Sequence, residues 1–246
     1  MSYVNRRLSK GLQNYNIFLE YANFNHSKHV FFMNQNKYYA ILGKIMSEGR
    51  MQLNKKGNIK YLTNQVLSLE PADLLDIFET HGIARKKLKS ELTLFMAGVK
   101  STEQYREAGI TWWDYCGTTL INSYPTYFER LPALIDKINA EKRTSKNYVL
   151  FLGETGVETN QQPCLSLVQF QIEDGQVVVS AYQRSSDANL GLPCDIYHLY
   201  LMAREIDLPL KSITLFLGNV HIYENNLVKT FELLRGKEDV KFDLNV

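Results

Sequence analysis

The strongest constraint in this chain is a β-hairpin signature that spans residues 164–182. Residues 164–172 are mostly apolar and include Val, Phe and Ile, which favour β-strands. Asp174 and Gly175 form the Asp-Gly pair that is typical of two-residue hairpin turns. Residues 177–182 then return as a second, largely apolar segment. The pattern predicts two adjacent antiparallel strands, with Cys164 at the start of the first.

Polar residues and a tight turn follow the second strand. Arg184 and Ser185 lie just past its end, and a guanidinium fork beside a hydroxyl suits a phosphate. Gly-Leu-Pro at residues 191–193 predicts a sharp turn before a helix over residues 196–206. Asp195 stands at or next to that helix start, where a carboxylate commonly caps free amides. Considered alone, Cys164 fits a small buried hydrophobic residue.

Composition limits the class of protein. The 246 residues can form one large domain with a sizeable core, and the formal net charge of +2 gives no field that favours nucleic acid or acidic membranes. Three widely spaced cysteines match no zinc or disulfide pattern, so we expect a reduced, cytoplasmic protein without a metal. The sequence has no apolar run of membrane-spanning length.

Residues 163–195 resemble, in order and spacing, the active-site region of thymidylate synthases and their relatives. The matching residues are Pro163-Cys164, Gln169-Phe170, Tyr182-Gln183-Arg184-Ser185, Asp187, Leu190-Gly191-Leu192-Pro193 and, at the position that reads the pyrimidine, Asp195. The resemblance implies an α+β, thymidylate synthase-like fold with a mixed or antiparallel β-sheet core and surrounding helices. It also implies a single catalytic domain over residues 35–246, preceded by an N-terminal extension over residues 1–34.

The resemblance extends to three residues upstream of this region. Residues 91–98 match the family pattern Glu-Leu-x-x-Phe-x-x-Gly on a helix expected at 86–97, which implies that Glu91 lies in the active site. Burial there would raise its pKa and let it relay protons to the ring. A surface or capping carboxylate is the structural alternative. Trp113 matches a tryptophan that packs against folate, or is an aromatic core residue, and Tyr124 matches a tyrosine of the proton-removal network.

Substrate contacts are also implied by the resemblance. The implied nucleotide-binding residues are Gln183, Arg184, Ser185, Asp187, Asn219, His221, Tyr223 and Lys146, and the implied folate-binding residues are Trp113, Asp187 and Gly191. Strand alternation sends His221 and Tyr223 to one face, where both can bind a sugar hydroxyl. Lys146 replaces one of two arginines that reach the partner's phosphate across a homodimer interface. Lys55 or Lys56 replaces an arginine of an earlier turn, unless that turn is simply a solvated basic one.

The implied chemistry is one-carbon transfer from 5,10-methylenetetrahydrofolate to a pyrimidine nucleoside monophosphate. Cys164, with its pKa lowered by Arg184, adds to carbon 6 so that carbon 5 becomes nucleophilic. Hydride then yields a methyl group, whereas water yields a hydroxymethyl group. Proteins of this family that act on uracil carry Asn where this chain has Asp195, and a carboxylate suits the amino edge of cytosine. A plain helix cap is the structural alternative for this aspartate.

Two further departures favour hydroxymethylation. Leu165 follows the cysteine where synthases have His, and the sequence ends at Val246, just after a strand expected at residues 240–244, without the apolar tail that seals synthases. We therefore expect a folate-dependent 5-hydroxymethyltransferase acting on (d)CMP. The alternatives are a divergent thymidylate synthase that methylates dUMP and a nucleotide- or RNA-binding homologue that has lost catalysis.

Periodicity predicts several other elements. Helices are expected at residues 37–47 and 127–142, and strands at residues 59–69 and 212–217. A further helix is expected after residue 226, before the final strand.

Overall fold

The computed structural model describes residues 36–154, 161–237 and 240–243. The expected N-terminal extension, residues 1–34, lies outside the described residues. The described helices are, in chain order, α2 (Lys37–Glu48), α3 (Pro71–Thr80), α4 (Arg85–Met96), α5 (Thr102–Glu107), the 3₁₀ turn η2 (Asp114–Cys116), α6 (Tyr124–Phe128), α7 (Leu131–Glu141), α8 (Gly191–Arg204), the 3₁₀ turn η3 (Glu224–Asn226) and α9 (Leu227–Leu234).

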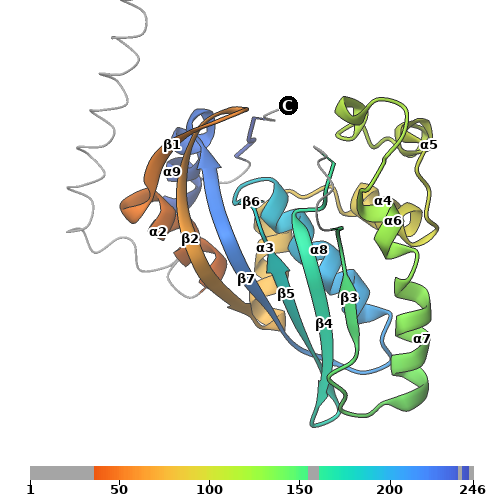
Figure 1. Ribbon diagram of the computed structural model, residues 1–246. Helices are drawn as coiled ribbons and strands as arrows, with labels where there is room; N and C mark the ends of the chain where they lie inside the picture. The colour runs from red at the N-terminus through yellow and green to blue at the C-terminus, as the bar shows by residue number, and fades with distance from the viewer. Residues whose placement is uncertain (1–35, 155–160, 238–239, 244–246) are drawn as a thin grey trace, which may run out of the picture.

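One mixed sheet organises the described part of the chain (Figure 1). Its strands are β1 (Arg50–Asn54), β2 (Gly57–Leu69), β3 (Val149–Phe151), β4 (Leu165–Glu173), β5 (Gln176–Gln183), β6 (Ser186–Asp187) and β7 (Leu210–Tyr223). The spatial order is β1-β2-β7-β5-β4-β3, and β6 pairs with β7. The pairs β5–β7 and β6–β7 are parallel and the others are antiparallel. This sheet and its helices confirm the predicted α+β class.

The predicted hairpin is present as β4 and β5. Asp174 and Gly175 connect the strands with φ angles of 52° and 73°, the left-handed pair that a type I′ turn requires. Glycine adopts such an angle without steric cost, and Asp tolerates it better than most residues. The turn fixes the register from Glu173 opposite Gln176 as far as Leu167 opposite Tyr182, and a register shift between Leu165 and Leu167 then sets Leu165 opposite Gln183. The two ends of the motif are therefore neighbours at one end of the sheet.

Helix α8 packs its apolar stripe against the sheet, behind β7 and β5 in Figure 1. Ile196, Leu199 and Met202 are fully buried at i, i+3 and i+6 spacing, against strand residues such as Val179 and Leu215. Burying a side chain of this size stabilises the fold by about 1.5–3 kcal/mol. This packing holds the first turns of α8 in a fixed position at the sheet. None of the helices in the described residues is long and apolar enough to cross a bilayer.

Two expected helices and one expected strand have different bounds. The helix expected at residues 196–206 is α8, which begins five residues earlier, at Gly191. The helix expected at residues 127–142 is divided into α6 and α7, because Pro132 starts a new helix in the first turn of α7. The strand expected at residues 212–217 is the 14-residue β7, which pairs with β2 as far as Tyr223. The expected bounds of the helix at residues 37–47 and of the strand at residues 59–69 are correct to within two residues.

The final strand predicted at residues 240–244 is wrong for its described residues, 240–243, which have no strand partner. The side chain of Asn226 takes the place of a partner strand. Its amide donates to the Asp243 carbonyl at 2.9 Å, and its Oδ1 accepts from the Asp243 N–H at 2.8 Å. Both backbone groups of Asp243 are thereby satisfied without a sheet.

Candidate active site

Cys164 lies immediately before β4, with its side chain partly exposed. Its backbone carbonyl accepts from the Arg184 N–H at 2.9 Å. The Arg184 guanidinium also donates to two carbonyls of the same loop, those of Pro163 at 3.1 Å and Gln162 at 2.9 Å. One arginine therefore holds the backbone of Cys164 and of the two residues before it.

Burial raises the pKa of the Cys164 thiol above its ordinary value. The positive charges of Arg184 and Lys56 lower that pKa, but burial outweighs them, and the carboxyl of Asp195 raises it further. The expectation that Arg184 leaves the thiol with a lowered pKa is therefore wrong for the protein without ligand. The Cys164 thiol is therefore protonated at neutral pH.

Tyr124 reaches the thiol from the start of α6. Its hydroxyl accepts from the backbone N–H of Leu165, the residue after Cys164, at 3.3 Å. Its ring stacks on Phe95 of α4 with centroids 5.2 Å apart. Burial, followed by the charges of Asp195 and Cys164, raises the pKa of Tyr124. The hydroxyl is thus a neutral group that faces both.

Glu91 is buried on α4, with 3% of the residue exposed. Its Oε1 accepts two hydrogen bonds of 2.5 Å, from the indole N–H groups of Trp112 and Trp113. Its Oε2 lies 3.3 Å from Nε2 of His198 on α8. Burial raises the pKa of Glu91, although these three partners oppose the shift. Gly98, the last residue of the matching motif, has a φ of 66° where the chain leaves α4, which explains the glycine there.

Asp195 is the fifth residue of α8, which begins at Gly191. It is therefore not the helix cap that the sequence offered as its alternative role. The side-chain amide of Gln183 donates to Oδ2 of Asp195. Burial is the main cause that raises the pKa of Asp195 from 3.8 to about 7, and the charge of the nearby Glu91 carboxyl is the second cause. Both protonation states of this half-buried carboxyl are accessible at neutral pH.

A second group of polar residues lies along β6 and the end of β7. Asp187 Oδ1 accepts from the N–H groups of Asn189 and Leu190 at 3.0 and 3.4 Å, and Asp187 pairs with His221 in the sheet. The rings of His221 and Tyr223 are 5.2 Å apart, so they share one face, as strand alternation predicts. Burial raises the pKa of Tyr223, and the charges of Asp187 and Cys164 raise it further, so this group faces the thiol.

The protonation state of this second group follows from its burial. Burial lowers the pKa of His221 to about 4, so the ring is neutral at pH 7, and its Nδ1 lies 3.0 Å from Oδ1 of Asn219. Burial raises the pKa of Asp187 to about 6. Gly218 lets β7 approach the end of β5 closely, since an added Cβ would lie 2.8 Å from the Tyr182 hydroxyl and 3.1 Å from the Arg184 carbonyl oxygen.

Two further candidates, Ser185 and Gly191, lie close to these groups along the chain. Ser185 separates β5 from β6, and Gly191 is the first residue of α8. Lys146 is not brought to the thiol within one chain. It is exposed before β3, and its carbonyl accepts from the Gln169 side chain at 3.1 Å. Gln169 is five residues from Cys164, about 16 Å along an extended strand.

Lys56 is brought toward the thiol by the turn between β1 and β2. Its Nζ lies 4.8 Å from the centre of the Tyr115 ring, and its charge lowers the pKa values of Cys164 and Cys116. Lys55, its neighbour in the turn, has no such effect on the Cys164 thiol. The positive charge predicted from this turn is therefore present on one side of the candidate site.

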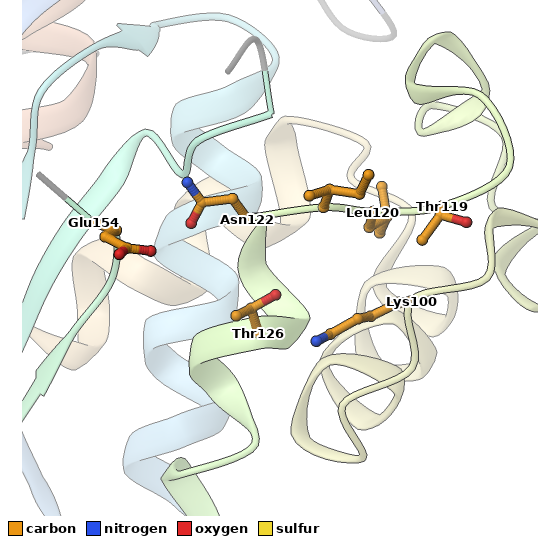
Figure 2. A pocket seen from close by; sticks show the side chains of 7 residues that line it. Lys100, Thr119, Leu120, Asn122, Thr126 and Glu154 are labelled. Carbon is orange, nitrogen blue, oxygen red and sulfur yellow. The ribbon is translucent and has the colours of Figure 1, made fainter. Parts of the chain in front are cut away.

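A separate pocket lies beside the loop that precedes Tyr124 (Figure 2). It has a volume of about 460 Å³ and is lined by Lys100, Thr119, Leu120, Ile121, Asn122, Thr126 and Glu154. None of the residues implied in substrate binding or catalysis lines it. Among the described residues, no group of three or more His, Cys, Asp or Glu side chains is arranged to hold a metal ion.

Two residues of the cluster, Trp112 and His198, were not predicted. His198 follows Asp195 by three residues on α8, a spacing that puts both on one helix face, and this spacing was the available signal. Trp112 carried no signal beyond its position next to Trp113. The cluster therefore unites a thiol, two carboxyls, a phenol, an imidazole and two indoles from five separate segments.

These features define an α+β protein with a thiol-centred candidate active site at one end of a mixed sheet. The family model described as "Thymidylate synthase" matches residues 36–245. The chain belongs to the thymidylate synthase family.

Two curated relatives give the extent of the similarity. A thymidylate synthase of Mycoplasma pneumoniae is 48% identical over 69 residues, which cover 26% of this chain and 24% of the relative. A thymidylate synthase of Staphylococcus haemolyticus is 31% identical over 120 residues, which cover 46% of this chain and 37% of the relative. The matched segments thus span well under half of either relative.

Proposed function

We propose that this protein is a folate-dependent 5-hydroxymethyltransferase of (d)CMP, working through a covalent adduct of Cys164. The observation that carries the proposal is Asp195, a carboxyl with a pKa of about 7 that Gln183 fixes through Oδ2. Cytosine offers a donor, its exocyclic amine, beside an acceptor, nitrogen 3. A neutral Asp195 accepts from the amine and donates to nitrogen 3. An ionised Asp195 still accepts from the amine.

The remaining binding roles follow the geometry of the cluster. Arg184, Ser185 and Lys56 supply positive charge and donors for the phosphate, with Lys146 reaching it from a second copy of the chain. The sugar hydroxyl is bound by His221 and Tyr223, whose rings share one face, and Asn219 lies beside His221. The pterin of 5,10-methylenetetrahydrofolate stacks over Trp113, near Asp187 and Gly191. The indole N–H of Trp113 already binds Glu91, so its ring face is the part that contacts folate.

The reaction begins with sulfur adding to carbon 6. The thiol proton passes to water as the carbon–sulfur bond forms, and Asp195 donates its proton to nitrogen 3 of the ring and regains it when that bond breaks. Carbon 5 then attacks the methylene carbon, and its own proton leaves through the Tyr124 hydroxyl, which passes its phenolic proton on to water. Departure of tetrahydrofolate leaves an exocyclic methylene. Water adds to that methylene, a proton is released through Glu91, and the carbon–sulfur bond breaks to regenerate the thiol. No oxidant or reductant is needed.

A homodimer is part of the proposal. A row of apolar residues crosses the sheet, and four of its five members, Val66, Phe216, Tyr182 and Phe151, are exposed. Val66 pairs with Phe216, Phe216 with Tyr182, Tyr182 with Leu167, and Leu167 with Phe151. Such a contiguous apolar surface is typical of a contact with another protein surface. A second copy of the chain that covers this row would also bring Lys146 to the neighbouring site.

Methylation of dUMP is the second candidate, favoured by the names of the two relatives. A neutral Asp195 can donate to oxygen 4 of uracil and accept from its nitrogen 3 proton, whereas the ionised form repels oxygen 4. Methylation also consumes a hydride of tetrahydrofolate and so yields dihydrofolate. The two candidates therefore differ in the base, the product and the folate that is released.

Product analysis tests the proposal. The protein is incubated with 5,10-methylenetetrahydrofolate and, separately, dCMP, CMP or dUMP, and each nucleotide is examined by mass spectrometry. The proposal expects cytidylate to gain the mass of one formaldehyde unit, with no dihydrofolate formed. A uridylate that gains one methylene unit, together with dihydrofolate, supports the second candidate and rejects the first. Absence of any product with retained nucleotide binding supports a homologue without catalysis.

A further inference from the structure

The hydrogen bonds of Glu91 differ between its two oxygens. Oε1 accepts from both Trp112 and Trp113 at 2.5 Å. An indole N–H is a donor only, so these two bonds occupy the acceptor positions of Oε1 and leave no place there for a proton. Any proton that Glu91 binds or transfers must therefore be carried by Oε2.

Oε2 faces His198. Nε2 of His198 lies 3.3 Å from Oε2 and 3.1 Å from the backbone carbonyl oxygen of Leu88. Because a carbonyl oxygen only accepts, the nitrogen near it carries a hydrogen. This N–H donates to the Leu88 carbonyl, and Oε2 of Glu91 lies 3.3 Å from the same nitrogen, so the positive edge of the ring lowers the pKa of Glu91. His198 is itself buried and packs edge-on against Phe95, with ring centroids 6.0 Å apart.

The other ionisable groups around Glu91 are acids, and their negative charges disfavour its ionised form. Asp195 and Cys194 on α8 and Tyr105 on α5 each interact with its charge, and each has a raised pKa to which Glu91 contributes. The indoles are neutral. Among the described residues around Glu91, His198 is thus the titratable side chain that lowers the pKa of this carboxyl.

We propose that His198 is a positioning residue for Glu91: its Nε2 edge lies against Oε2, the oxygen that the two indoles leave free, and favours the ionised form of that carboxyl. Its relevance to turnover rests on the proposed function. Its effect on Glu91 does not, because it can be measured in the protein without substrate.

The two tryptophans of the chain supply the readout. Trp112 and Trp113 are the only two in the sequence, and both donate to Glu91. Their fluorescence, excited where tyrosine does not absorb, therefore reports the ionisation of Glu91 as pH is varied. The wild-type curve should show a titration that is absent in Glu91→Gln.

Three variants test His198. His198→Leu removes the N–H and should move the fluorescence midpoint to higher pH by about one unit, since a lost donor disfavours the ionised form. His198→Gln keeps an N–H near Nε2 and should restore most of the shift. His81→Leu, which changes a half-buried histidine outside this cluster, should leave the midpoint unchanged. If His198→Leu does not fold, His198→Asn, whose amide is too short to reach Oε2, replaces it.

Two outcomes overturn the proposal. One is a His198→Leu or His198→Asn midpoint equal to that of the wild type, and the other is a wild-type curve as flat as that of Glu91→Gln. The same variants then enter the product assay. His198→Leu should lower kcat by about 10-fold or more with little change in KM, and the limb of the kcat–pH profile should move with the fluorescence midpoint. An unchanged kcat profile rejects the catalytic part alone. Absence of wild-type turnover rejects the proposed function and leaves the fluorescence result standing.

Discussion

Gln183 donates its side-chain amide to Oδ2 of Asp195, and this bond fixes the orientation of the carboxyl. Gln183 is fully buried on β5, whereas Asp195 is on α8, so the contact joins the sheet to the helix that packs on it. A buried amide that binds only one oxygen leaves the other oxygen, Oδ1, to bind the base or carry the proton. Base selection is therefore expected to depend on this one side chain.

The first prediction concerns Asp195→Asn. An amide donates to oxygen 4 of uracil and accepts from its nitrogen 3 proton, but it cannot match cytosine in the same orientation. An unpaired buried polar group costs about 1–3 kcal/mol, so kcat/KM for cytidylate should fall by about 5-fold to 150-fold and that for dUMP should rise. Competition between the two nucleotides, followed by mass analysis of the products, measures the ratio. An unchanged preference would show that Asp195 does not read the base.

The second prediction concerns how the free energy of unfolding of Asp195→Asn, compared with that of the wild type, depends on pH. Because the folded pKa of Asp195 is raised from 3.8 to about 7, the folded state binds more protons than the unfolded state between these values. The contribution of this group is therefore fully present below about pH 4 and is lost as pH rises to 7. Asp195→Asn should be more stable than the wild type at pH 8, by about 1 kcal/mol, and similar at pH 4. Urea unfolding at both pH values provides the measurement.

Cys164→Ser should abolish product formation while leaving folding and nucleotide binding intact. A hydroxyl is a far weaker nucleophile than a thiol, so the loss should exceed about 1,000-fold. Cys116→Ser removes another partly exposed thiol and should keep activity, which makes it the matched control. Mass spectrometry with a 5-fluoro nucleotide, whose carbon 5 has no proton to lose, should trap an adduct on Cys164 alone. An adduct on Cys164→Ser would disprove the assignment.

Sequence patterns predicted most of this cluster because each motif has a fixed local geometry. The hairpin turn aligns Leu167 with Tyr182, and strand alternation puts His221 and Tyr223 on one face. Local sequence patterns did not predict which side chains of distant elements come into contact. The contact between Glu91 and His198 joins two helices more than a hundred residues apart, and no local rule specifies such a pair.

Sequence analysis did not predict β1, which lacks a local signal, or α3, which has one. Every residue of β1 is exposed, so its pattern shows no alternation of buried and exposed residues. Helix α3 has a clear start, with Pro71 in its first turn and a capping box between Glu70 and Asp73. These residues are typical of a helix N-terminus. The raised pKa of Cys164 depends on burial, which the sequence does not reveal.

Lys56 and Lys55 form a matched pair for testing the phosphate site. The charge of Lys56 acts on the Cys164 thiol, whereas that of Lys55 does not. Lys56→Ala should therefore raise the KM for the nucleotide by about 10-fold and weaken its salt dependence, because one charge contact with the phosphate is lost. Lys55→Ala should change KM by less than about 2-fold. Equal effects of the two variants would assign the turn to general surface charge.

The last prediction tests the dimer. Phe216 and Tyr182, neighbours in the central part of the apolar row, are each 45% exposed, an unusual exposure for large apolar rings in the middle of a sheet. Phe216→Arg puts a charge on this face and should convert a dimer to a monomer in size-exclusion chromatography with light scattering. Val228→Arg, which changes a similarly exposed residue on α9, should leave the dimer intact. If Lys146 completes the partner's phosphate site, the monomer should also bind the nucleotide more weakly, and Lys146→Ala should reproduce that loss without changing the oligomeric state. A wild-type protein that is monomeric at assay concentration, with full activity, would contradict both the interface and the role of Lys146.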